Sequence, residues 1–142
     1  MGKAPARKSI SATVVSLKDW QATDGPKLST LDTGTYYLLI GHAIGRLAKA
    51  TEGASTELQQ NLLGYFTLIS NMQINGLVPT LSLLRDKTGA TYAGIQKPMV
   101  RLADARLIER HTFKNANGKS EVYFAISAAA MTSTAKKAAK LA

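Results

Sequence analysis

The stretch TGATYAGIQKPMVRLADARLIER, residues 88–110, decides the fold, because its apolar residues have the spacing of a helix that packs against a core. Ile95, Met99 and Leu102 lie four and then three residues apart, so they share one face of a helix over 91–106. The opposite face carries Tyr92, Gln96, Lys97 and Arg101. The sequence therefore predicts an amphipathic helix whose outer face is rich in hydrogen-bonding groups.

Pro98 stands in the middle of this helix, where a proline forfeits one backbone hydrogen bond and pushes its ring against the carbonyl four residues back. That carbonyl belongs to Gly94, and glycine absorbs such strain more easily than other residues. Two interpretations stay open. Either Thr91 caps a long helix that is bent or locally unwound at Pro98, or a shorter helix begins near Gln96 with Pro98 in its first turn.

A short helix is expected before this stretch and a β-hairpin after it. Pro79 suits the first turn of the short helix and Gly89 its end, with a buried side of Leu81, Leu83 and Leu84. After Arg106 the apolar residues alternate with polar ones, through Phe113 and then at Val122, Phe124 and Ile126. The dipeptide at 117–118 is Asn-Gly, a strong hairpin-turn signal.

Two more helices are expected nearer the N-terminus. From Thr35 to Thr51 one apolar stripe is formed by Leu39, Ile40, Ala43, Ile44, Leu47 and Ala48. Thr56 with Gln59 fits a capping box for a second helix that ends near residues 75–76. Before these helices lies an irregular arm, residues 1–33, in which 11–17 could be a strand. After the domain at 34–127, the alanine- and lysine-rich segment 128–142 is expected as a helix or a frayed tail.

Composition narrows the function. The chain has 142 residues, enough for one ordinary domain, and its 18 lysines and arginines against 9 acidic residues give a net charge of +9. Such charge favours polyanionic partners, of which nucleic acid is the first candidate. There is no cysteine, which excludes disulfides and thiolate metal sites. No apolar run reaches signal-peptide length or the roughly 20 residues of a membrane span, so we expect a cytoplasmic protein.

The order helix, turn, helix and hairpin is the plan of a helix-turn-helix with a wing. Residues 81–127 resemble the winged helix-turn-helix domains of bacterial transcriptional regulators, and look most like the MarR family. In that family the second helix leads into a leucine, polar residues, and then Gly-Leu-Ile and an arginine. Here residues 102–110 read LADARLIER, with Arg106 in place of the glycine. Two departures are the wing, KNANGKSE, which lacks the family's aspartate and arginine, and Arg85, which replaces a small residue between the two helices.

The resemblance implies a dimeric repressor that binds double-stranded DNA with helix 91–106 in the major groove. Gln96 and Arg101 have the donors and acceptors to read base edges, while Thr91 and Tyr92 would reach a phosphate or a base. Lys97, Lys114 and Lys119 suit phosphates, with Lys119 standing in for the wing arginine, and Arg110 is expected to be structural or phosphate-facing. The expected DNA-binding residues are therefore Thr91, Tyr92, Gln96, Lys97, Arg101, Arg110, Lys114, Asn115, Asn117 and Lys119. No metal or cofactor is expected, and any small-molecule effector is unknown.

Other functions remain as alternatives. A winged-helix protein of plasmid or phage type could act in replication, partition or transfer, or bind DNA architecturally with little sequence preference, and a protein-interaction module could reuse the fold. An enzyme is not expected, because His42 and His111 have no nucleophile elbow, phosphate loop or metal-ligand spacing near them. The GxxxG spacing of Gly41 and Gly45 indicates close helix packing, either within the subunit or across a dimer.

Overall fold

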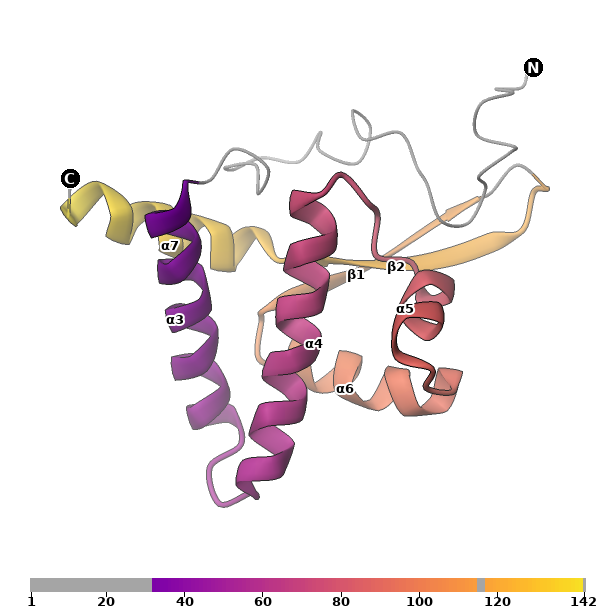
Figure 1. Cartoon of the computed structure of the whole chain (residues 1–142), viewed down its shortest axis with the longest axis horizontal. Coiled ribbons are helices and arrows are strands. Elements are labelled where there is room, and N and C mark those ends of the chain that lie inside the picture. Colours follow the sequence, from indigo (N-terminus) through magenta and orange to yellow (C-terminus); the bar gives the residue numbers. More distant parts are fainter. Residues whose placement is uncertain (1–31, 115–116, 142) are drawn as a thin grey trace.

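The computed structural model describes residues 32–114 and 117–141. Over them the chain is mainly helical with one antiparallel hairpin, which confirms the expected mainly α fold with a small β-hairpin (Figure 1). The helices are α3 (Thr33–Ala50), α4 (Thr56–Ile74), α5 (Leu81–Thr88), α6 (Tyr92–Asp104) and α7 (Ala128–Leu141), and the strands are β1 (Ile108–Lys114) and β2 (Ser120–Ile126). The arm at 1–31, including the strand considered at 11–17, lies outside the described residues.

Polar caps define where the helices begin. Ser55 caps α4, since its hydroxyl accepts the Leu58 N–H at 3.2 Å, so the capping box expected at Thr56 is wrong by one residue. Thr80 caps α5 in the same way, and Pro79 precedes this cap instead of lying in the first turn. The first error arises because Ser55 and Thr56 offer the same capping chemistry, and the second because Pro79 suits both the first turn of a helix and the residue before its cap.

Helix α6 is continuous from Tyr92 to Asp104 with Pro98 buried inside it, so the interpretation of a late start near Gln96 is wrong. Thr91 caps the helix as expected, because its Oγ accepts the Gly94 N–H at 3.1 Å. The long form buries the full apolar register of Ile95, Met99 and Leu102. Burial of three large side chains is worth several kcal/mol, about the cost of a proline in a helix interior.

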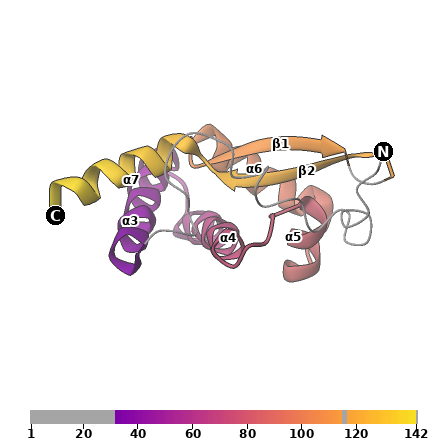
Figure 2. The same cartoon turned by 90° about the horizontal axis from the view of Figure 1, so that it is seen from above.

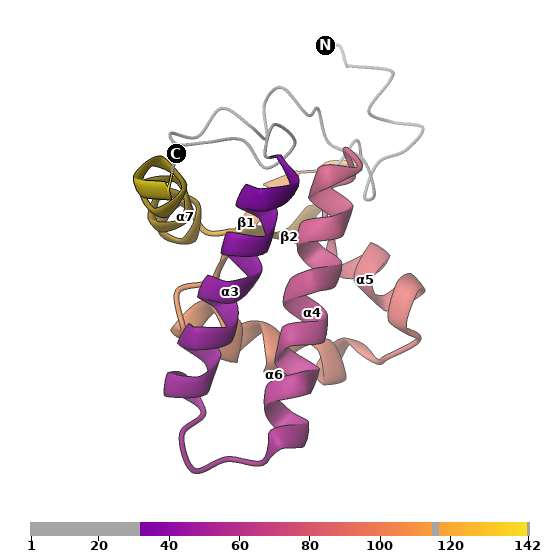
Figure 3. The same cartoon turned by 60° about the vertical axis from the view of Figure 1, so that its left-hand side comes forward.

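The core lies where α4 packs against α3, α6 and β2, and α7 packs across α3 (Figures 1 and 3). Phe66 and Ile69 of α4 are fully buried in it. A polar contact also ties α4 to the hairpin, because the Ile126 N–H donates to Gln73 Oε1 at 2.7 Å in a buried position. Helix α6 and the hairpin are therefore both anchored to one central helix, α4.

The two strands pair antiparallel in register from Ile108 opposite Ile126 to Lys114 opposite Ser120. The segment just before α5 lies along the free edge of β2, since Thr80 forms a bridge with Tyr123 and the Phe124 N–H donates to Pro79 O at 2.9 Å. This places the start of α5 beside the middle of β2.

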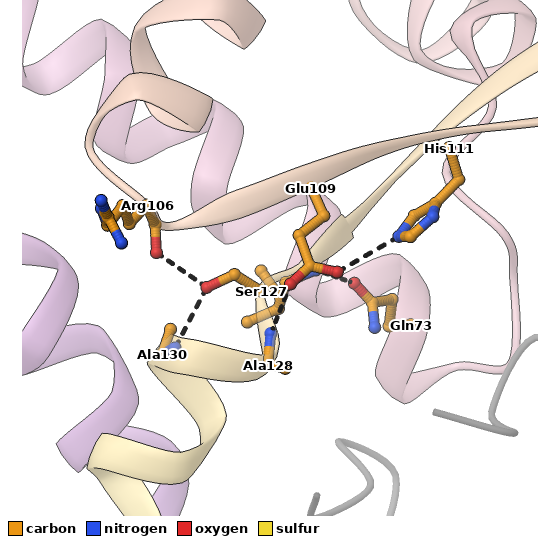
Figure 4. A network of polar contacts seen from close by, with 8 residues as sticks. Gln73, Arg106, Glu109, His111, Ser127, Ala128 and Ala130 are labelled. Carbon is orange, nitrogen blue, oxygen red and sulfur yellow. Dashed lines mark hydrogen bonds and ion pairs between the residues drawn. The ribbon is translucent and has the colours of Figure 1, made fainter. Parts of the chain in front are cut away.

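A tight turn joins α6 to β1. Arg106 has a φ of 61°, the left-handed conformation that glycine adopts most easily, and the Leu107 N–H reaches back to Leu102 O at 3.0 Å. Ser127 donates to Arg106 O at 2.7 Å and accepts the Ala130 N–H at 3.0 Å, so it joins this turn to the start of α7 (Figure 4). Of the two forms expected for 128–142, helix or frayed tail, the structure has the helix, over Ala128–Leu141.

Candidate nucleic-acid interface

Helices α5 and α6 are joined by a short, well-defined turn. Gly89 ends α5 with a φ of 73° and its N–H donates to Arg85 O at 2.8 Å, and two residues later Thr91 caps α6. The buried sides of both helices meet the core through Leu84 and Ile95. The turn and the caps together fix how α6 leaves α5, so the outer face of α6 has a defined direction.

The outer face of α6 carries the residues expected there. Tyr92, Gln96, Lys97 and Arg101 are all exposed. Val100 lies among them and is 59% exposed, an unusual position for a β-branched apolar residue on a helix surface. Sequence reasoning did not select Val100, although its place between Gln96 and Arg101 could have done so. The face thus combines two forked hydrogen-bonding groups with one apolar contact, which suits base edges and a thymine methyl group.

The hairpin has two different faces, because side chains alternate along a strand. Arg110, Thr112 and Lys114 share the face of buried Ile108, and across the strands this face continues with Phe124 and Ile126. It is the face turned toward α6. The opposite face is aromatic, with His111 and Phe113 against Tyr123 at ring-centroid distances of 5.0 and 5.8 Å.

A groove of about 140 Å³ separates the edge of α6 from the hairpin. Gln96, Val100 and Asp104 line it from the helix, and Arg110 lines it from β1. The structure therefore brings Gln96 and Arg110, predicted from separate elements, to one surface. Asp104 adds a negative charge to the lining of this groove.

The remaining predicted residues lie at the far end of the hairpin. Lys114, Asn117 and Lys119 are exposed, while Asn115 lies outside the described residues. This end of the hairpin points to the side of the molecule that carries α5, away from the C-terminal end of α7 (Figures 1 and 2). The basic wing residues and the α5–α6 turn thus share one end of the molecule.

Arg85, another basic residue, was considered from the sequence only for its effect on the packing of the two helices. Arg85 does not separate α5 from α6. Its side chain is exposed, and its Cζ lies 4.7 Å from the ring centroid of Tyr92. The contact joins residues seven positions apart on two helices, so it depends on the angle of the turn and no local pattern predicts it.

The two histidines have structural surroundings. Burial lowers the pKa of His42 below its usual value, and the nearby charges of Lys137 and Arg46 lower it further. His111 stacks on Tyr123, and its Nε2 lies 3.3 Å from Glu109 Oε1. In the described parts of the chain, no cluster of three or more histidine or acidic side chains is placed to hold a metal ion. No described helix is both long and apolar enough to span a membrane.

The glycines of α3 are not in tight contacts inside the subunit. A Cβ added at Gly41 or Gly45 would meet nothing within 4 Å, so close packing within the described subunit is wrong as an explanation of the GxxxG spacing. Tyr37 and Ile44 lie on the same exposed side of α3, at 68% and 50% exposure. This side of α3 is an apolar surface with room for another helix.

Comparisons with protein-family models, with curated proteins and with solved structures gave no match to this chain.

Proposed function

We propose that the protein is a winged helix-turn-helix DNA-binding protein that acts as a dimeric, sequence-specific transcriptional repressor. The observation that carries the proposal is the exposed face of α6, which presents Gln96 and Arg101, with Gln96 sharing a groove with Arg110 of the hairpin. The order α4, edge segment, α5, α6, β1 and β2 supports the winged fold. A cytoplasmic location goes with this role.

The contacts divide by chemistry. Gln96 and Arg101 would form paired hydrogen bonds to base edges in the major groove, with α6 as the reading helix. Lys97, Lys114 and Lys119 would contact phosphates, and Arg110 would contact a phosphate beside the groove that it lines with Gln96. The role needs neither a metal nor catalysis.

A kinship with the MarR family belongs to the same proposal. Arg106 occupies the position at which that family usually has glycine, and its φ of 61° is the conformation for which glycine is the favoured residue. The departure in sequence thus keeps the backbone geometry that the resemblance implies.

We propose that the dimer forms through the exposed side of α3, with α7 alongside. Glycine in a helix interior costs about 1 kcal/mol relative to alanine, and neither Gly41 nor Gly45 is required by a contact inside the subunit. A second copy of α3 packed over Tyr37, Ile44 and these glycines would use the space that they leave. Leu141, at the end of α7, is another exposed apolar side chain, at 74% exposure.

Selection from a random duplex DNA pool at near-physiological salt tests the proposal. A dimeric repressor should enrich an inverted repeat whose half-site centres lie about 10 base pairs apart. Retention of DNA without an enriched motif would contradict the repressor role and favour architectural or replication-associated binding, which the net charge of +9 also supports. Absence of retention would contradict DNA binding altogether.

A further inference from the structure

Arg85 and Tyr92 form an exposed pair at the corner between α5 and α6. Arg85 belongs to the last turn of α5, Tyr92 is the first residue of α6, and the guanidinium carbon lies 4.7 Å from the centre of the ring. A guanidinium that stacks on an aromatic face is attracted by the ring and loses rotational freedom, while the N–H groups along its edge still point outward. The pair therefore holds a cation in one orientation on the surface.

The hydrogen-bonding capacity of Arg85 is not used inside the described molecule. Over residues 32–114 and 117–141 its contact is the ring of Tyr92, and no carboxylate is paired with it. A guanidinium carries five N–H donors in a planar fork that matches two oxygens of a phosphate. An oriented fork without an internal acceptor is suited to an external anion.

The surroundings of the pair favour negative charge. No acidic residue lies in the first turn of α6, and the last turn of α5 carries Arg85 and Lys87 against one acidic residue, Asp86, so positive charge is in excess there. The backbone N–H groups at the start of α6 add a partial positive charge. In a helix-turn-helix the first helix crosses the sugar-phosphate backbone when the second lies in the major groove, so Arg85, in the last turn of α5, would face that backbone.

We infer that Arg85, held in place by the ring of Tyr92, binds a backbone phosphate of duplex DNA and so fixes the register of α6 in the groove. The inference rests on the proposed function and deepens it. It makes Tyr92 a positioning residue, which acts through Arg85 and not through a base. Phosphate contacts set orientation and carry no sequence information directly, so the pair should contribute equally on preferred and mixed sequences.

A double-mutant cycle tests the pair. Dissociation constants are measured over a range of salt concentrations, on the duplex enriched by selection and on a duplex of mixed sequence. Arg85→Ala should weaken binding about tenfold on both duplexes and reduce the salt slope by about one. Tyr92→Leu should weaken binding less, and the double variant should be no weaker than Arg85→Ala alone. Tyr92→Phe keeps the ring and should bind like the wild type.

Lys87→Ala is the matched control, because Lys87 is an exposed cation of the same turn without an aromatic partner in the described chain. The fold-losses of affinity in Lys87→Ala and in Tyr92→Leu should multiply in the double variant, because the two residues act independently. Arg85 and Tyr92 are both exposed, so thermal unfolding of each variant should match the wild type. Independent effects of Arg85→Ala and Tyr92→Leu, or an unchanged salt slope in Arg85→Ala, would overturn the inference while leaving DNA binding intact. A wild-type protein that binds no duplex would overturn the proposed function and this inference with it.

Discussion

Arg106 has a backbone conformation that is unfavourable for a residue with a side chain, and contacts with the rest of the fold keep it there. Its left-handed backbone is held by hydrogen bonds on both sides, from the Arg106 N–H to Ala103 O and from Ser127 Oγ to Arg106 O. Arg106→Gly should therefore raise the free energy of unfolding by up to about 1 kcal/mol, measured by urea denaturation. Arg101→Gly, in the interior of α6, should lower it by about 1 kcal/mol. A loss of stability in Arg106→Gly would mean that the arginine side chain holds the turn.

Substitutions of Arg101 and Lys114 test whether the protein recognises the base sequence of DNA or only its phosphate charge. Arg101→Ala should cost about 1 to 3 kcal/mol on the preferred duplex and relax the preference at one base pair. Lys114→Ala should weaken every sequence alike. Binding assays on single-base variants of the selected duplex measure both effects. Equal losses on all sequences for both variants would contradict the role of Arg101 as a base reader.

Some positions of the candidate site could be predicted from the sequence and others could not. The exposed residues of α6 were predictable, because a helical period assigns each position to a face. The contacts of Arg85 with Tyr92 and of Gln73 with Ile126 were not, since each joins two elements whose relative angle no local pattern specifies. Gly94, which was predicted to absorb strain from Pro98, lies in the first turn of α6. The burial of Pro98 could not be predicted locally, because it depends on how the whole apolar face of α6 packs.

At the scale of elements, the helices and the hairpin were predictable and their ends less so. Periods of about 3.6 and 2 residues distinguish helix from strand in this chain. The choice of Ser55 over Thr56 as a cap required the packing around it. The C-terminal segment could not be settled between helix and tail, because alanine favours a helix but a helix of this length also needs the packing against α3 and the cap at Ser127.

The contact between α3 and α7 predicts a pH dependence. Because burial, Lys137 and Arg46 lower the pKa of His42, the folded protein binds this proton more weakly than the unfolded chain does. Stability from this group is present above the ordinary histidine pKa of 6.5 and is lost as the pH falls through 6.5 toward the lower pKa of the folded state. Lys137→Ala should raise the pKa of the His42 ring, measured by NMR titration. An unchanged pKa would mean that α7 does not sit against α3 in solution. Lys140→Ala, one turn further along α7, is the control.

For the whole molecule, the decisive question is what covers the exposed side of α3. Ile44→Glu should dissociate the proposed dimer in analytical ultracentrifugation without lowering the stability of the fold, because Ile44 is already 50% exposed. Ile74→Glu offers a matched control on α4, where an isoleucine is 40% exposed outside this surface. Dissociation by both variants, or by neither, would contradict an interface at α3. The monomer should also lose the preference for paired half-sites.

Arg46 connects α3 to the C-terminal end of α6. Its guanidinium reaches from α3 and donates two hydrogen bonds, at 3.1 and 3.0 Å, to the carbonyl of Ala105 at the C-terminal end of α6. A cation there also complements the helix dipole. A rotation of α3 about its own axis would therefore pull one end of the reading helix with it. If the proposed dimer forms at the exposed side of α3, the side chains between the two copies of α3, and not the hairpin, would set the spacing of the two proposed DNA-reading helices along the duplex.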